Sequence, residues 1–382
     1  MGSNMRSDLT VLPRRILARQ LFDGAGAEPA TDQIVTLHGN VIHDVAPFRA
    51  GQSLSELAEY DIVTPGLIDL QINGANDVQF NADPSLSALR QIANGASQGG
   101  TAWILPTFVT AHGQAYLTAI DVVTEAISAE VPGILGLHLE GPFLSPHRPG
   151  IHDATAIRSL DRADLSVLTQ TRHFPLLLTL APECTSPAQI AELTAASVTV
   201  FAGHSAAGFD EMKLAQAAGL RGATHLFNAM SQMTGREPGV VGAVLGLPGI
   251  YAGLIADGHH VHWNNVQLAA KMLPNHLCLV TDAMCTLAGR LTEFALNAET
   301  IALKDGRLTN VDGTLAGAHI AMDESLRNMM DKGLVSPAQA VKCATKNPAD
   351  ALNMSHRLGQ IKTGFAPRLS VFTKDWTSLA VV

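Results

Sequence analysis

The stretch GILGLHLEGPFL, residues 133–144, decides the fold, because an apolar run ends on a carboxylate, Glu140, directly before a Gly-Pro break. Side chains alternate between the two faces of a strand. One face would therefore carry Leu135, Leu137 and Leu139. The other would carry a titratable pair, His138 and Glu140. An isolated strand-end glutamate is usually solvated or paired with an arginine, so the meaning of Glu140 depends on the rest of the chain.

The composition is that of an ordinary globular protein. With 382 residues, 47% hydrophobic and 15% charged, the chain is long enough for one large domain and a small one. Lys and Arg total 25 against 34 Asp and Glu, and the net charge of -9 argues against nucleic-acid or anionic-membrane binding. The four cysteines lack C-x-x-C spacing, and the sequence has neither a secretory segment nor an 18-residue apolar run. These features predict a cytoplasmic protein.

Eight short apolar runs lie between about residues 60 and 285, each followed by a Gly, Pro or polar break and an amphipathic stretch. They are IVTPGLIDLQING, TAWILPTFVT, GILGLHLEGPF, PLLLTLAPE, SVTVFAGH, GATHLFNAM, GIYAGLIADGHH and HLCLVTDAM. This alternation predicts an α/β fold, a (β/α)8 TIM-type barrel, whose covered parallel strands are apolar throughout. A doubly wound sheet is disfavoured because no G-x-G-x-x-G or Walker-type loop follows any run. Ser186 and Ser336, each followed by Pro and then Gln, are predicted helix caps.

Both ends of the chain are strand-like. Residues 32–47, DQIVTLHGNVIHDVAP, read as a hairpin that turns at Gly39-Asn40, and RLSVFTKDWTSLAVV at residues 368–382 is strand-like again. We expect the two ends to pair into a small β-sandwich domain. The predicted limits are 8–60 and 355–382 for this domain and 61–354 for the barrel.

Four polar residues stand where barrel strands should end. Glu140 ends the third run, His204 the fifth and Asp282 the eighth, while His225 lies in the sixth. Loops at the carboxyl ends of the strands form the active site of such barrels. Each residue alone could be structural, but two imidazoles and a carboxylate make a three-ligand site for a divalent metal with a position left for water. Asp282 could then accept a proton from that water.

A series of motifs covers residues 60–320 in this order: PGLIDLQING, LHLEGPF, GIHDA, TLAPE, AGHS, ATHLFNAM, GREPG, ADGHHVH, LVTDA and GTLAGA. In these motifs the sequence resembles the amidohydrolase superfamily, and within it the family of N-acetylglucosamine-6-phosphate deacetylases. The resemblance implies that Glu140, His204 and His225 bind metal and that Asp282 is the catalytic acid and base. It also implies that His152 helps to polarise the acetamide carbonyl.

The same resemblance implies the substrate residues Ile151, His152, Asn228, Ala229, Arg236, His260, Leu315, Ala316 and Gly317. Among them, Asn228, Ala229 and Arg236 match the phosphate site, and residues 315–317 match a loop at the acetyl end. The implied reaction removes the acetyl group from N-acetylglucosamine 6-phosphate, giving glucosamine 6-phosphate and acetate. A homodimer is expected, with Arg236 crossing the interface to the phosphate of the neighbouring chain.

The first strand departs from many amidohydrolases. Gln71 and Asn73 stand where these enzymes have a His-x-His pair, and Pro182-Glu183 stands where some relatives have a lysine that bridges two metals. Amides bind zinc or iron less well than imidazole does. We therefore expect one divalent ion per chain, with zinc the first candidate and iron or another divalent ion as alternatives.

Two other functions remain open at this point. The chain could be another amidohydrolase that acts on a related N-acyl sugar phosphate or a cyclic amide, or a deaminase. It could also be a catalytically silent barrel that binds a ligand, since fold alone does not guarantee activity. The motifs ATHLFNAM and GREPG favour a small phosphorylated amino sugar, and the complete set of three ligands with Asp282 favours an enzyme.

Overall fold

Eight parallel strands form a barrel in this computed structural model, which describes residues 14–49, 51–53, 57–297 and 299–382. The barrel strands are β5 (Leu67–Ile72), β8 (Thr101–Val109), β9 (Leu137–Glu140), β10 (Leu176–Leu180), β11 (Thr199–Ala202), β12 (Gly222–Ala223), β13 (Tyr251–Leu254) and β14 (Leu277–Leu279). They pair in chain order. Each lies within one of the eight apolar runs, so the predicted barrel is confirmed.

The barrel closes where the last strand meets the first. Just beyond β14, the Asp282 amide donates to the Gln71 carbonyl (2.9 Å), and the Asn73 amide donates to the Ala283 carbonyl (2.8 Å). A parallel bridge also joins Ile72 to Ala283. This seam matters for function because it fixes the predicted base, Asp282, to the first strand.

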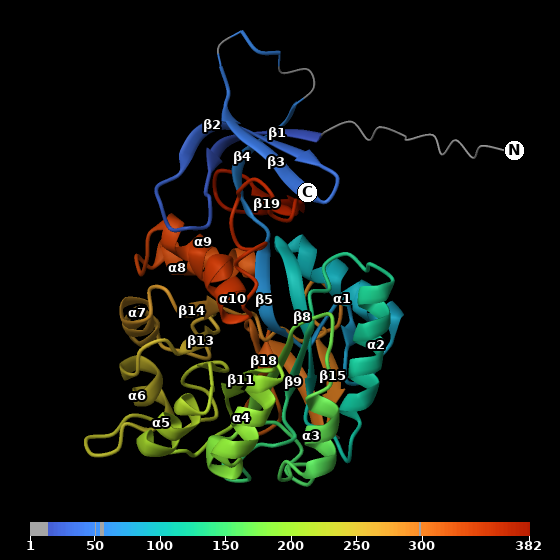
Figure 1. The fold of residues 1–382 in the computed structure, drawn as a ribbon, viewed down its shortest axis with the longest axis vertical. Coiled ribbons are helices and arrows are strands. Elements are labelled where there is room, and N and C mark those ends of the chain that lie inside the picture. Colours follow the sequence, from blue (N-terminus) through green and yellow to red (C-terminus); the bar gives the residue numbers. More distant parts are fainter. Residues whose placement is uncertain (1–13, 50, 54–56, 298) are drawn as a thin grey trace, which may run out of the picture.

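Helices cover the outside of the barrel (Figure 1). They are α1 (Leu86–Gln98), α2 (Tyr116–Ser128), α3 (Arg162–Leu168), α4 (Pro187–Ala195), α5 (Phe209–Ala217), α6 (Gly239–Gly246), α7 (Trp263–Met272), α8 (Met322–Asp331), α9 (Pro337–Ala344) and α10 (Lys346–Ala351). The predicted caps are confirmed, since Ser186 and Ser336 each accept a hydrogen bond from the amide three residues later, at the starts of α4 and α9. No helix of the described residues is long and apolar enough to cross a membrane.

A six-stranded sheet joins the two ends of the chain at one end of the barrel (Figure 1). Its order is β20 (Ser378–Val381), β19 (Leu369–Phe372), β4 (Leu57–Pro65), β1 (Arg14–Leu21), β2 (Ala30–His38) and β3 (Val41–Pro47). The hairpin β2–β3 turns at Gly39-Asn40, as predicted. The limits 8–60, 61–354 and 355–382 stay a prediction, and residues 8–13, 50 and 54–56 lie outside the described residues.

A second sheet, which the sequence analysis did not anticipate, follows the eighth barrel strand. It consists of β15 (Glu293–Leu296), β16 (Glu299–Lys304), β17 (Arg307–Thr309) and β18 (Leu315–Ala318). Its apolar side packs on Met284 and Ile151. A two-stranded ribbon of β6 (Gly74–Ala75) and β7 (Val78–Gln79) follows the first barrel strand. The four-stranded sheet therefore lies against the loops at the carboxyl ends of the strands.

The alternation predicted around Glu140 holds only in part. Leu137 and Leu139 pack in the large apolar cluster that includes the helices, whereas Leu135 packs in a separate cluster. The reason is that β9 begins at Leu137, so the regular alternation does not extend back to Leu135. His138 faces inward, where it lines a small internal cavity with residues of other barrel strands and contacts the hydroxyl groups of Thr107 (3.1 Å) and Thr179 (2.8 Å).

Candidate active site

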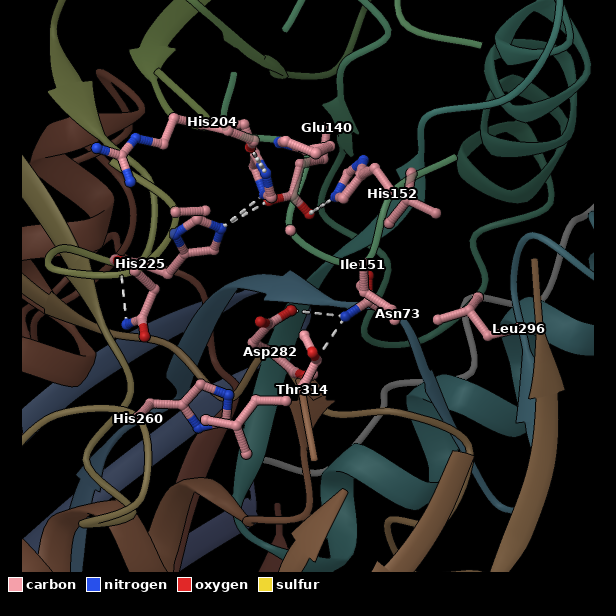
Figure 2. Close-up of a pocket in the computed structure, with 18 of the residues that line it drawn as sticks. Asn73, Glu140, Ile151, His152, His204, His225, His260, Asp282, Leu296 and Thr314 are labelled. Carbon is pink, nitrogen blue, oxygen red and sulfur yellow. Dashed lines mark hydrogen bonds and ion pairs between the residues drawn. The ribbon is translucent and has the colours of Figure 1, made fainter. Parts of the chain in front are cut away.

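The four predicted strand-end residues converge. Oε1 of Glu140 lies 2.9 Å from Nε2 of His225 and 3.2 Å from Nε2 of His204, and these two nitrogens are 3.1 Å apart. Figure 2 shows the three side chains pointing toward one another, with Asp282 on the other side of the cavity. All four residues are buried. Residues 21 to 142 positions apart in the sequence thus lie together at one end of the barrel.

The backbone at three of these residues is strained. His204 (φ 47°), His225 (φ 32°) and Asp282 (φ 50°) adopt the left-handed backbone conformation, which residues other than glycine rarely adopt. Such strain costs about 1–3 kcal/mol per residue and concentrates at functional sites. Each residue lies two or three positions beyond the end of a barrel strand, and its side chain lines the cavity at the mouth of the barrel.

These ligands fit a divalent ion. A metal bound at about 2.0–2.2 Å holds its ligand atoms roughly 3.3 Å apart, which is close to the spacings among Glu140, His204 and His225. Nδ1 of His204 donates to the backbone carbonyl of Arg148 (3.0 Å), which leaves Nε2 free of hydrogen and able to bind a metal. Burial raises the pKa of Glu140, but the adjacent imidazoles of His204 and His225 together outweigh it and hold this pKa well below its ordinary value. The carboxylate is therefore charged and ready to bind a cation.

His152, predicted to bind substrate, lies directly beside this cluster. One ligand atom each from His152, Glu140 and His204 lie within 4.8 Å of one another, and the rings of His152 and His204 are 4.2 Å apart between centroids. Burial, with repulsion from His204, lowers the pKa of His152 to about 3, so its ring is neutral. Its Nδ1 contacts the hydroxyl of Thr110 (2.9 Å), and this hydroxyl also donates to the Glu140 carbonyl (3.1 Å).

The amides of the first strand occupy the space between the two carboxylates. Nε2 of Gln71 donates to Oδ1 of Asp282 (3.0 Å) and lies 3.3 Å from each carboxylate oxygen of Glu140. Nδ2 of Asn73 donates to the same Asp282 oxygen (2.7 Å). Glu183, at the position of the bridging lysine, instead accepts hydrogen bonds from Ser205 and Ala206. Amide hydrogens, which cannot ligate a metal, thus stand where a second ion would need ligand atoms.

A cavity of about 550 Å³ opens beside this cluster. Its lining includes seven of the predicted substrate residues, namely Ile151, His152, Asn228, Ala229, His260, Leu315 and Gly317. In Figure 2, His225 and His260 lie on one side of Asp282, and Ile151 and Leu296 lie on the other. Polar residues lie on both sides of Asp282, since His152 and Asn73 share the side of Ile151 and Leu296.

His260 is oriented by a residue that the sequence analysis did not single out. Nδ1 of His260 lies 2.6 Å from Oδ2 of Asp257, while Oδ1 of Asp257 accepts the backbone amides of His259 (2.8 Å) and His260 (2.9 Å). A carboxylate that accepts the Nδ1 hydrogen leaves Nε2 of the imidazole available to a ligand. The three-residue spacing in ADGHH was the available signal, because it lets a turn bring the two side chains together.

Two predicted substrate residues do not line the cavity. Ala316 is fully buried in the apolar cluster beneath the four-stranded sheet, because successive residues of β18 alternate between its two faces and Leu315 and Gly317 lie on the face toward the cavity. Arg236 is exposed, and within the described residues its side chain makes no hydrogen bond or ion pair. The neighbouring Glu237 accepts the amides of Phe209 (2.8 Å) and Gly239 (2.9 Å), so it is not an ion-pair partner of Arg236.

Comparisons with known proteins agree with this site. The model of the amidohydrolase family matches residues 62–381. The chain is 33% identical over 357 residues to the N-acetylglucosamine-6-phosphate deacetylase of Haemophilus influenzae, covering 92% of this chain and 93% of that protein. It is 37% identical over 300 residues to the N-acetylgalactosamine-6-phosphate deacetylase of a Shewanella species, covering 78% and 76%. The crystal structure of the N-acetylglucosamine-6-phosphate deacetylase from Pasteurella multocida matches with a TM-score of 0.91 and 30% identity, covering 97% of this chain and 98% of that one.

With its barrel, its Glu-His-His cluster and this match over most of its length, the chain belongs to the amidohydrolase family. Within that family it is a hydrolase of the amino-sugar-phosphate deacetylase kind.

Proposed function

We propose that this chain hydrolyses the acetamide of N-acetylglucosamine 6-phosphate to glucosamine 6-phosphate and acetate, as a cytoplasmic homodimer with one divalent ion, zinc, per chain. The observation that carries the proposal is the placement of Asp282. One of its carboxylate oxygens, Oδ1, takes the amide hydrogens of Gln71 and Asn73. Its other oxygen makes no hydrogen bond within the described residues and lies in the cavity that Glu140, His204 and His225 also line.

Glu140, His204 and His225 would hold the ion. When bound, a divalent ion there supplies Lewis-acid polarisation of a carbonyl oxygen and lowers the pKa of bound water. Hydrolysis then needs a base for the water and an acid for the leaving amine. Asp282 can serve as both, taking the water proton on Oδ2 and returning it to the amine nitrogen.

The electrostatics of Asp282 suit this exchange. Burial and the charge of Glu140 raise the pKa of Asp282 to about 6, against opposing contributions from His225, His260 and Asn73. A carboxylate whose pKa lies near the working pH can accept and release a proton in turn. Because Asp282 must be ionised to begin the reaction, activity should fall as the pH drops.

His152 would stabilise the negative charge that develops on the carbonyl oxygen. For that role Nε2 must carry the single hydrogen of the neutral ring, so the Thr110 hydroxyl would have to turn its one hydrogen from the Glu140 carbonyl (3.1 Å) to Nδ1 of His152. The 2.9 Å contact between Thr110 and His152 allows this arrangement. Thr110 would then position the donor, although it touches no part of the substrate.

Arg236 is proposed to bind the phosphate of the substrate that lies in the cavity of the partner chain. Its exposure and its lack of an ion pair leave the guanidinium free, and Glu237 anchors the loop that carries it to the start of α5. This segment leads into α6 at the periphery of the barrel (Figure 1). An arginine placed there can bind a phosphate with charge-assisted hydrogen bonds if a second chain brings its cavity alongside.

The test combines elemental analysis with turnover of three compounds: N-acetylglucosamine 6-phosphate, its 4-epimer N-acetylgalactosamine 6-phosphate, and unphosphorylated N-acetylglucosamine. We expect about one metal ion per chain and the highest kcat/KM on the first compound. The 4-epimer is the second candidate substrate, because the Shewanella relative carries that name and is 37% identical. If neither phosphosugar releases acetate, the proposal is overturned. If kcat/KM is higher on the 4-epimer, N-acetylgalactosamine 6-phosphate is the substrate instead of N-acetylglucosamine 6-phosphate.

A further inference from the structure

Arg148 is an exposed arginine at the rim of the cavity, which it helps to line. Of the residues that line the cavity, it is the only lysine or arginine. Its side chain makes no hydrogen bond or ion pair with any part of the chain that the structure describes. An arginine on an acidic protein would readily find a carboxylate on an ordinary surface. Arg148 instead leaves its five donors available at the mouth of the site.

The backbone around Arg148 is tied to the metal-binding cluster. Its carbonyl accepts the Nδ1 hydrogen of His204 (3.0 Å), and the Ser145 amide donates to the His204 carbonyl (2.9 Å). Gly150, at φ 57°, packs so closely that a Cβ there would lie 3.1 Å from the His204 ring and 3.8 Å from Cβ of Ala229. The loop of residues 145–150 is therefore held in place and borders Ala229.

This position lies beside the residues expected to contact phosphate. Asn228 and Ala229 line the same cavity as Arg148, and a Cβ at Gly150, two residues after Arg148, would lie 3.8 Å from that of Ala229. The acids that line the cavity, Glu140 and Asp282, would repel a phosphate dianion. A cation from the same chain would offset this repulsion, and an arginine can bind phosphate oxygens with two parallel hydrogen bonds.

We propose that Arg148 binds the 6-phosphate of the substrate within its own chain's cavity, and so determines the preference for phosphorylated over plain amino sugars. This inference rests on the proposed function, and it names a residue that acts in the same chain, in addition to Arg236 from the partner. It does not require the dimer, because Arg148 lines the cavity of its own chain.

The experiment compares Arg148→Gln and Arg148→Lys with the wild-type enzyme, using Arg90→Gln as the control, since Arg90 is an exposed arginine on α1. The measured quantity is the ratio of kcat/KM for N-acetylglucosamine 6-phosphate to kcat/KM for N-acetylglucosamine. We expect Arg148→Gln to lower this ratio at least tenfold, mainly through KM, Arg148→Lys to recover part of it, and Arg90→Gln to leave it unchanged. Metal content should stay the same, because the bond to His204 uses the backbone carbonyl.

A second measurement does not depend on turnover. Titration calorimetry with glucosamine 6-phosphate should show at least tenfold weaker binding to Arg148→Gln than to the wild type. If the wild type prefers the phosphosugar but Arg148→Gln keeps that preference, or loses activity equally on both sugars, the inference is wrong and the proposed function stands. If the wild type shows no preference for the phosphosugar, this inference fails, whereas the proposed function fails only if neither phosphosugar releases acetate.

Discussion

Asp69 offers the sharpest test of the energetics of the barrel seam. This carboxyl lies on β5, is fully buried, and accepts hydrogen bonds from the Thr281 hydroxyl (2.5 Å), the Gln71 amide (3.1 Å) and the Thr281 amide (3.2 Å). It thus joins the first strand to the residue directly before Asp282. Burial raises the pKa of Asp69 to about 7, despite these hydrogen bonds, and the charge of Asp282 adds to the increase.

The raised pKa makes stability depend on pH in a defined direction. In the unfolded chain Asp69 loses its proton near pH 4, whereas in the native protein it keeps it to about pH 7. Between these values the native state binds more protons, so the free energy of unfolding falls as the pH rises, by up to about 1.4 kcal/mol per pH unit. Integrated from pH 5 to pH 8, the loss is roughly 2.5 kcal/mol.

The perturbation is Asp69→Asn. Asn has the same shape, its Oδ1 can keep both backbone amides, and its Nδ2 can donate to the Thr281 hydroxyl, which can turn its own hydrogen toward the Gln71 carbonyl at 3.4 Å. The variant has no proton to lose. We therefore expect its free energy of unfolding, relative to the wild type, to increase by roughly 2.5 kcal/mol between pH 5 and pH 8.

The assay is urea unfolding followed by tryptophan fluorescence at pH 5, 6, 7 and 8, at a fixed saturating metal concentration because bound metal itself stabilises the fold. Asp121→Asn, an exposed position on α2, is the control for the loss of a carboxylate. Parallel pH curves for the wild type and Asp69→Asn, within about 0.5 kcal/mol, would refute the reasoning. Such parallel curves would mean that the hydrogen bonds to Asp69 lower its pKa by as much as burial raises it.

Three further predictions concern the site. Asp282→Asn should keep its metal, measured by elemental analysis, while its kcat falls far more than tenfold. A kcat within tenfold of the wild type, about 1.4 kcal/mol in barrier, would exclude Asp282 as the base. Glu140→Ala, His204→Ala and His225→Ala should each lose the single ion on dialysis, whereas two ions held per wild-type chain would contradict the one-metal hypothesis. Arg236→Ala should raise KM for the phosphosugar about tenfold, a cost of roughly 1.5–3 kcal/mol, and mixed dimers with Asp282→Asn chains should restore that KM in one cavity. Mixed dimers without restoration would place Arg236 in its own chain's site.

Much of the fold follows from local sequence patterns. The eight apolar runs each contain a barrel strand, and the Ser-Pro-x-Gln caps begin α4 and α9, because burial on both faces and capping depend on residues close together in sequence. The positions of Glu140, His204, His225 and Asp282 at strand ends were predictable for the same reason. Because a barrel brings the carboxyl ends of its strands together, identifying the residues at those ends in the sequence is enough to locate the site.

Other features depend on contacts between distant segments. Thr110 and Arg148 acquire their roles only from partners or a cavity assembled in space, as in the 42-residue separation between Thr110 and His152. The inward packing of Ala316 follows from the sheet of β15–β18, which no local pattern had indicated.

The class of fold, the order of the strands and the residues at their carboxyl ends could be predicted from local patterns, because strand and helix periodicity are local properties. The left-handed backbone at His204, His225 and Asp282, the amide of Gln71 between two carboxylates, and the raised pKa of Asp69 depend on the folded arrangement of the whole barrel. The physical reason is that strain, burial and the electric field at a group are set by all the atoms packed around it. Those atoms come from strands far apart in the chain.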